Sequence, residues 1–176
     1  MKYSRLKAKP ITGPARTATV LFFLMVWSSM AYGSGLKVGE PVPIFVLTNS
    51  KGRQVSMASL IDKPTVIYFT HNACHYCTQI IVFLKRAEAE FGRKNLRIFG
   101  INVMAKDETL VKAYKEDLDF IFPMLAGNRW DVLKAFKIAY VPVLIFVDEN
   151  KITQKVVGHY IHQPELHKNI KEIMGQ

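Results

Sequence analysis

The stretch YFTHNACHYCTQI, from Tyr68 to Ile80, decides the fold, because it joins two different patterns and holds both cysteines of the chain. The β-branched and aromatic run from Lys63 to Thr70 leads into it and predicts a buried strand. Apolar residues then recur at steps of three or four, which predicts a helix, at Ile80, Ile81, Phe83, Leu84, Ala87 and Phe91. We therefore expect Cys74 and Cys77 at the junction between a strand and a helix.

A cysteine at the start of a helix has a distinct chemistry. The free N–H groups and the helix dipole favour an anion there, so they favour the thiolate form of Cys74. The thiolate is the nucleophilic form of cysteine. Cys77, one turn further on, is placed to attack a mixed disulfide formed on Cys74. The pair therefore predicts a cycle between dithiol and disulfide.

Two other roles for the pair are open. A disulfide that closes a two-residue gap stabilises a fold very little, because longer loops gain more. A metal site needs further ligands, and His71 and His75 are the nearby candidates. Copper(I) suits two thiolates. A periplasmic copper-binding or metallochaperone module is therefore the non-enzymatic alternative.

The rest of the chain predicts a mixed sheet. Residues 39–60 predict two short strands around a turn at Asn49–Gly52. Further elements are a strand at 96–103, helices at 107–118, 130–138 and 163–174, and strands at 141–148 and 153–160. A strand–helix–strand order implies parallel neighbours, whereas the tight turn at 149–151 implies an antiparallel pair. A central sheet with helices on both faces follows.

The first 33 residues predict a targeting segment. A basic leader, Met1 to Arg16, precedes the apolar run Thr17 to Met30, and small residues stand at Ser29 and Ala31. Cleavage is expected after Ala31 or Gly33. The run is shorter than the ~20 residues that span a bilayer comfortably. We expect residues 1–33 to be a signal peptide or an N-terminal membrane anchor and residues 34–176 to form the domain. Export would place that domain in an oxidising compartment, the periplasm.

The composition is that of an ordinary globular protein. Hydrophobic residues make up 49% and charged residues 22% of the 176 residues. The net charge of +10 is partly due to the bases of the leader, which precede the first acid, Glu40. No pattern of interleaved basic and aromatic residues indicates nucleic-acid binding.

Together these motifs resemble the thioredoxin superfamily, in its exported TlpA/ResA-like (redoxin) branch. The resemblance covers Leu36 to Met174 and rests on the expected hairpin and on PTVIYFTHNACHYC, FGINV and FPMLAGNRWDVLKAFKIAYVPVLIFVDENKI. It implies an α/β, thioredoxin-like fold, in which a central mixed β-sheet is flanked by helices on both faces and carries an N-terminal β-hairpin extension.

The resemblance also implies roles for particular residues. Cys74 and Cys77 would be the catalytic pair, and Pro142 would form a cis peptide bond and lie against their disulfide. The Val141 backbone would offer hydrogen bonds to a bound peptide strand. A cis X–Pro bond is uncommon, so it marks a specific local geometry.

His75 and Tyr76 fill the gap between the cysteines, where the resemblance implies that they contact substrate. A protonated histidine there favours a more oxidising pair, as in oxidases and isomerases of the superfamily; the alternative is a solvated helix-start residue with little effect.

Other positions depart from the family pattern. Tyr68 stands where many thioredoxins have a buried acid, and Ile80 where many TlpA-like proteins have a glutamate. Ala73 replaces a common tryptophan. The usual proton acceptors for the second thiol are therefore missing.

The function that the resemblance implies is a periplasmic thiol–disulfide oxidoreductase that acts on cysteines of exported proteins, apocytochrome c in haem attachment among them. Its redox group would be the Cys74–Cys77 disulfide, with no separate cofactor. A membrane electron-transfer partner would keep the pair in its working state. A thiol peroxidase is a less favoured alternative, because Ile67 and His71 stand where peroxiredoxins have Pro and Thr or Ser.

Overall fold

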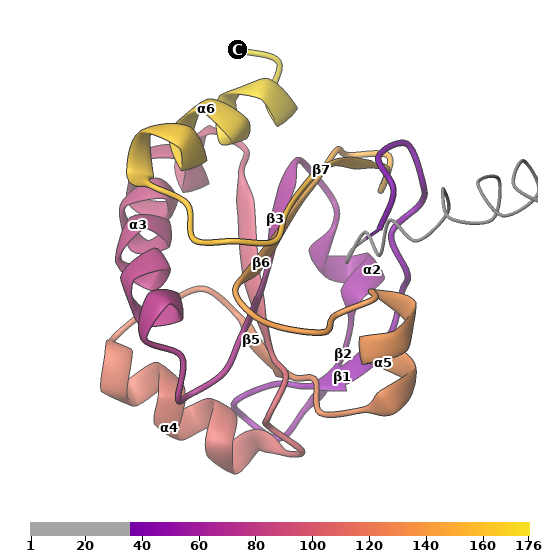
Figure 1. The fold of residues 1–176 in the computed structure, drawn as a ribbon, viewed down its shortest axis with the longest axis vertical. Coiled ribbons are helices and arrows are strands. Elements are labelled where there is room, and N and C mark those ends of the chain that lie inside the picture. The colour runs from indigo at the N-terminus through magenta and orange to yellow at the C-terminus, as the bar shows by residue number, and fades with distance from the viewer. Residues whose placement is uncertain (1–35) are drawn as a thin grey trace, which may run out of the picture. The chain divides into compact units, whose positions relative to one another are not determined.

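The computed structural model of the chain describes residues 36–176, so the targeting segment expected at residues 1–33 lies outside the described residues. The elements, shown in Figure 1, are β1 Val46–Thr48, β2 Gln54–Ser56, α2 Met57–Leu60, β3 Thr65–Thr70, α3 His75–Phe91, the short 3-10 helix η1 Gly92–Lys94, β4 Arg97–Asn102, α4 Glu108–Leu118, β5 Met124–Ala126, α5 Trp130–Ala135, β6 Val143–Val147, β7 Thr153–Val157 and α6 Gln163–Ile173.

The main sheet is mixed, as the sequence predicts. Its strands lie in the order β5-β4-β3-β6-β7. β3 runs parallel to β4, and β4 parallel to β5, whereas β6 is antiparallel to both β3 and β7. β1 and β2 form a separate antiparallel hairpin, so the expected N-terminal hairpin is confirmed. The expected α/β fold with a central mixed sheet is confirmed as well.

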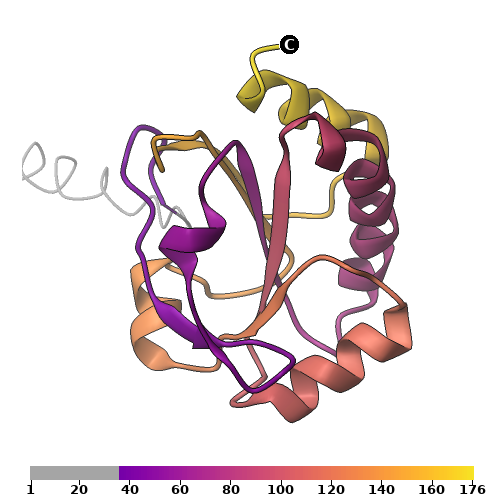
Figure 2. The same ribbon diagram turned by 180° about the vertical axis from the view of Figure 1, so that it is seen from behind.

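The two faces of the sheet carry separate cores, because successive side chains of a strand point to opposite faces. From β3, Val66 and Tyr68 pack with buried residues of α3, α4 and α6. Ile67 and Phe69 pack instead with buried residues of the hairpin, α2 and α5. Figures 1 and 2 show these helices on either side of the sheet. The strand thus reads as continuously apolar because both of its faces are covered.

The structure corrects three details of the predicted elements. β5 was not expected, because its three fully buried residues are too few to show a strand pattern. The one-turn helix α2 was also missed, although Ser56 caps it by accepting the Ala58 N–H. α3 begins at His75, well before the first apolar residue at Ile80, because its first turn carries the second cysteine instead of a full apolar stripe.

No helix between residues 36 and 176 combines the length and the apolar character that crossing a membrane requires.

Candidate active site

The two cysteines form a disulfide at the first turn of α3, with their sulfurs 2.05 Å apart. Cys74 is the N-cap residue of the helix, and its sulfur accepts the N–H of Cys77 at 3.1 Å. Cys74 is partly exposed, whereas Cys77 is 0% exposed. The expected position of the pair at a helix start is therefore confirmed. A thiol from outside can reach only the sulfur of Cys74.

The loop before Cys74 is held in place from the neighbouring strand. Asn102, fully buried at the end of β4, donates a hydrogen bond from its side chain to Oδ1 of Asn72 at 2.7 Å. Its own Oδ1 accepts the N–H groups of Met104 and Ala105. One side chain thus ties the loop after β3 to the loop after β4. Sequence reasoning missed Asn102, although a lone amide at the end of an apolar strand is a usable signal, since buried polar groups need partners.

The peptide bond between Val141 and Pro142 is cis, as expected. Pro142 is buried, and Val141 packs against both cores of the sheet, one of which also contacts Cys74. Within residues 36–176, neither the amide nor the carbonyl of Val141 has a hydrogen-bond partner. Both groups are therefore available to a bound polypeptide segment.

His75 and Tyr76 lie on the surface beside the disulfide. His75 is hydrogen-bonded to the side-chain amide of Gln79 at 3.1 Å, so it bonds along its own helix. The Tyr76 ring is 59% exposed and lies 5.6 Å from the ring of Tyr160, between centroids. Tyr160 in turn packs edge-on against His162. An aromatic row therefore extends from the cysteine gap to the loop before α6.

Tyr68 lies beneath the pair, where the family resemblance would place an acid. Its hydroxyl donates to the carbonyl of Cys77 at 2.9 Å, and its side chain is fully buried. Burial raises the pKa of the Tyr68 phenol well above its usual value of about 10. The phenol therefore stays protonated at neutral pH and acts as a hydrogen-bond donor. It supplies no base for the Cys77 thiol.

The site contains no evident set of metal ligands. Among the described residues, no group of three or more His, Cys, Asp and Glu side chains is arranged to hold a metal ion. Nδ1 of His71, one of the two histidines considered for such a site, accepts the N–H of Ala73 at 3.1 Å.

Comparison with known proteins bears directly on this site. The sequence model described as the AhpC/TSA family matches residues 38–156. The chain belongs to the AhpC/TSA family. One curated relative is named thiol-disulfide oxidoreductase ResA, from Geobacillus kaustophilus (strain HTA426). It is 20% identical over 164 residues, which cover 90% of this chain and 94% of the relative.

Solved structures with the same fold include two redox proteins. A protein described as the thiol:disulfide interchange protein DsbE of Chlorobium tepidum superposes with a TM-score of 0.73 at 16% identity, covering 80% of this chain and 99% of that one. Peroxidoxin BcpB of Mycobacterium tuberculosis superposes with a TM-score of 0.68 at 17% identity, covering 80% of this chain and 97% of that one. These likenesses confirm a thioredoxin-like fold. Family, fold and disulfide together identify this AhpC/TSA member as a thiol–disulfide oxidoreductase.

A peroxidase pattern is absent from two positions of this AhpC/TSA member. Ile67 is fully buried on the α5 side of β3, where the pattern would need a proline. His71, where the pattern would need a hydroxyl, uses its ring nitrogen within the loop. Neither side chain offers the hydroxyl donor that the peroxide-binding arrangement requires.

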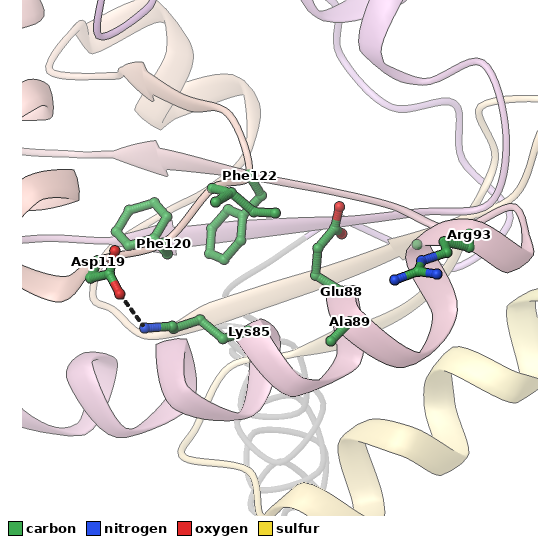
Figure 3. Close-up of a pocket in the computed structure, with 9 residues that line it drawn as sticks. Lys85, Glu88, Ala89, Arg93, Asp119, Phe120 and Phe122 are labelled. Atoms are coloured by element: carbon green, nitrogen blue, oxygen red, sulfur yellow. Dashed lines mark ion pairs between the residues drawn. The ribbon is translucent and has the colours of Figure 1, made fainter.

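A hollow lies away from the disulfide, between the C-terminal half of α3 and the loop before β5 (Figure 3). It measures about 500 Å³. Lys85 and Asp119 form an ion pair of 3.6 Å at one end, and the stacked rings of Phe120 and Phe122 form one wall. Burial raises the pKa of Glu88, which also lines the hollow.

Proposed function

We propose that the protein is an exported thiol–disulfide oxidoreductase that exchanges electrons with cysteines of other exported proteins. One observation carries this proposal: the Cys74–Cys77 disulfide has one partly exposed sulfur at a helix start and one buried sulfur behind it. That asymmetry assigns Cys74 the exchange with the partner and Cys77 the resolving step.

In the oxidising direction, a partner's thiolate attacks the sulfur of Cys74. The bond between the two sulfurs of the protein breaks, and Cys77 leaves with the electron pair. A second thiolate of the partner then attacks the mixed disulfide, so Cys74 leaves as a thiolate and the partner holds the new disulfide. In the reducing direction the same steps run backwards. The N–H of Cys77 stabilises the Cys74 thiolate in both directions, because it already donates to that sulfur.

The surroundings of the pair support binding of a polypeptide. The unpaired amide and carbonyl of Val141 can form two main-chain hydrogen bonds with an extended partner segment, beside Pro142. His75 and Tyr76 are exposed next to the reactive sulfur and would contact that segment. Aromatic rings supply contact area at a low entropic cost.

The cellular setting of this reaction is also a proposal. The basic and apolar pattern of residues 1–33 supports export to the periplasm, with the segment either removed or kept as an anchor. The resemblance to exported redoxins supports a membrane electron-transfer partner that resets the disulfide. Apocytochrome c is one candidate substrate among exported proteins that carry cysteines. The redox group is the protein's own disulfide, and the mechanism needs no further cofactor.

Two single replacements test the mechanism. Cys74→Ser should abolish disulfide exchange with a dithiol peptide or insulin, because the exchanging sulfur is gone. Cys77→Ser should instead accumulate a mixed disulfide with the partner, since no resolving thiol remains, and mass spectrometry would detect it. Full turnover by the Cys74→Ser variant would refute the mechanism.

A thiol peroxidase is the second candidate, because peroxidoxin BcpB of Mycobacterium tuberculosis shares the fold. The two candidates are distinguished by the rates at which hydrogen peroxide and a disulfide peptide oxidise the reduced protein. The proposed function requires faster oxidation by the peptide. Oxidation of Cys74 by peroxide at the higher rate would favour the peroxidase.

A further inference from the structure

An apolar groove begins beside the disulfide and continues over the end of α5. Its first part is a hollow of about 290 Å³. His71 and Val141 line the end nearest the disulfide, and the carbonyl of His71 accepts the N–H of Cys74. Leu133, Ile138 and Ala139 line the other end.

The second part of the groove continues from those same three apolar residues. It is a hollow of about 410 Å³ that Leu133, Ile138 and Ala139 share with the first. Trp130, whose side chain is 78% exposed, forms its outer wall. Lys134 and Lys137 complete the lining. The two hollows share three apolar residues and together extend from His71, which is hydrogen-bonded to the Cys74 backbone, to the exposed Trp130 with two lysines beside it.

The two lysines carry unneutralised charge. Arg129, the neighbouring cation, is paired with Asp131 at 2.6 Å and also donates to the carbonyl of Val46. By contrast, no acid lies within ion-pair distance of Lys134 or Lys137 among residues 36–176. The far end of the groove therefore attracts an anion.

The backbone at Lys137 is a second, independent observation. The N–H of Ile138 donates to the carbonyl of Leu133, and the N–H of Lys137 donates to the carbonyl of Lys134. These two bonds form the Schellman motif that commonly ends helices, in which glycine usually occupies the left-handed position. Lys137 occupies that position with φ 53°. Glycine would adopt this conformation without strain, so the presence of a lysine here indicates a role for its side chain.

We propose that this groove binds an extended segment of the partner polypeptide that has an apolar side chain beside its reactive cysteine and a carboxylate a few residues further on. The apolar side chain packs on Leu133 and Ile138, and the carboxylate pairs with Lys134 and Lys137. The proposal rests on the proposed function, because it gives the sequence preference of the exchanging partner.

The test uses the full chain with Cys77→Ser and peptides whose cysteine carries a thionitrobenzoate group. The thiolate of Cys74 attacks the peptide sulfur, a mixed disulfide forms, and thionitrobenzoate leaves with the electron pair and is read by its absorbance. Three peptides carry a leucine beside the cysteine and then two Glu, two Gln or two Lys residues. Each peptide is made with the flank before and after the cysteine, because the direction of the bound segment is part of the question.

The Glu peptide should react about three- to tenfold faster than the Gln peptide in one of the two orientations, and the Lys peptide slower than both. Raising the salt concentration should narrow the differences, because exposed charges are screened. Lys134→Glu combined with Lys137→Glu should reverse the order of the peptides. Lys51→Glu combined with Lys171→Glu makes the same charge change outside the groove and should preserve the order.

Lys137→Gly removes one positive charge from the groove and keeps the left-handed backbone at that position. It should reduce the preference for the Glu peptide without lowering the thermal unfolding midpoint, since glycine suits the left-handed position. Equal rates for the three peptides, or equal effects of the two double variants, would overturn the proposal that the groove binds the partner segment, and would leave the proposed function intact. If neither the peptides nor free cysteine-thionitrobenzoate reacted, the nucleophilic role of Cys74 would fail, and both proposals with it.

Discussion

The hydroxyl of Tyr68 donates a hydrogen bond to the carbonyl of Cys77, 2.9 Å away, inside the core beneath the disulfide. The resolving cysteine therefore rests on a neutral phenol instead of a carboxyl group. Since no carboxyl occupies this position, a proton released by the Cys77 thiol has to reach the partner or the solvent by another route. Of the two sulfurs, that of Cys74 is the one stabilised as an anion, by the N–H of Cys77.

Alkylation of the reduced protein should distinguish the two thiols. Cys74 should react first with iodoacetamide, because Cys77 is 0% exposed. The pH dependence of that reaction should give Cys74 a pKa below the ordinary value of about 8.5, since the helix start and the Cys77 N–H favour its thiolate. Peptide mapping by mass spectrometry identifies the modified residue. Faster modification of Cys77 would contradict the assigned roles.

Removing the phenol should change the stability of the protein at alkaline pH. The pKa of Tyr68 is raised by burial in the folded state, so above about pH 10 the unfolded chain loses this proton first. The folded state then holds more protons, and the free energy of unfolding falls as pH rises through that window. In urea titrations at pH 9 to 11, the unfolding free energy of Tyr68→Phe should therefore decrease less with pH than that of the original chain. At pH 7 the variant should be less stable by about 1 kcal/mol, because the hydrogen bond to the Cys77 carbonyl is lost.

The control for the alkaline effect is Tyr76→Phe. The Tyr76 ring is largely exposed in the folded protein, so its surroundings change little on unfolding. Its replacement should leave the alkaline slope as it is in the original chain. If the unfolding free energy of the original chain, Tyr68→Phe and Tyr76→Phe depended on alkaline pH in the same way, the Tyr68 phenol would not become buried on folding.

Asn102 should be coupled energetically to Asn72. Asn102→Ala leaves the Met104 amide and the Asn72 side chain without their partner, so we expect a loss of about 2–3 kcal/mol in unfolding free energy. The Ala105 N–H loses the side-chain acceptor but keeps its bond to the backbone carbonyl of residue 102. Asn72→Ala should cost less, because it removes only one of these bonds. In a double-mutant cycle, the two changes together should cost less than their sum. Strict additivity would mean that the 2.7 Å bond contributes nothing.

Glu88 should destabilise the fold at neutral pH. Burial raises its pKa, and its Oε2 atom is buried without a hydrogen-bond partner within residues 36–176. Because the folded pKa is raised, stability falls as pH rises from about 4.5 through the folded value. Glu88→Gln should therefore increase the urea midpoint at pH 7 and lose that pH dependence. Glu149→Gln, at an exposed position, is the control and should change neither quantity.

Sequence patterns predicted most of this architecture, for physical reasons. The strand Thr65–Thr70 is covered on both faces, so it reads as one apolar run, and Asp107 caps α4 with its side chain as its position suggests. The cysteine pair and the cis Val141–Pro142 bond also lie where the resemblance implies. Such features are local in sequence, or follow from a motif.

Other features depend on contacts between distant segments and left little trace in the sequence. β5 is defined by its pairing with β4, and Asn102 gains its role only once the β3 loop comes beside it. Lys137 gives no sign that it ends a helix in the left-handed conformation, because glycine is the residue expected there. The groove over α5 was therefore invisible before the fold was known.

The anchoring of the reactive loop by Asn102 has a practical consequence for redesign. The loop before Cys74 is tied to the neighbouring strand through Asn72 and Asn102, whereas the His75 side chain bonds only along its own helix, to Gln79, among residues 36–176. The dipeptide His75–Tyr76 can be exchanged as a cassette to tune the redox potential, while the scaffold that presents it to partners stays constant.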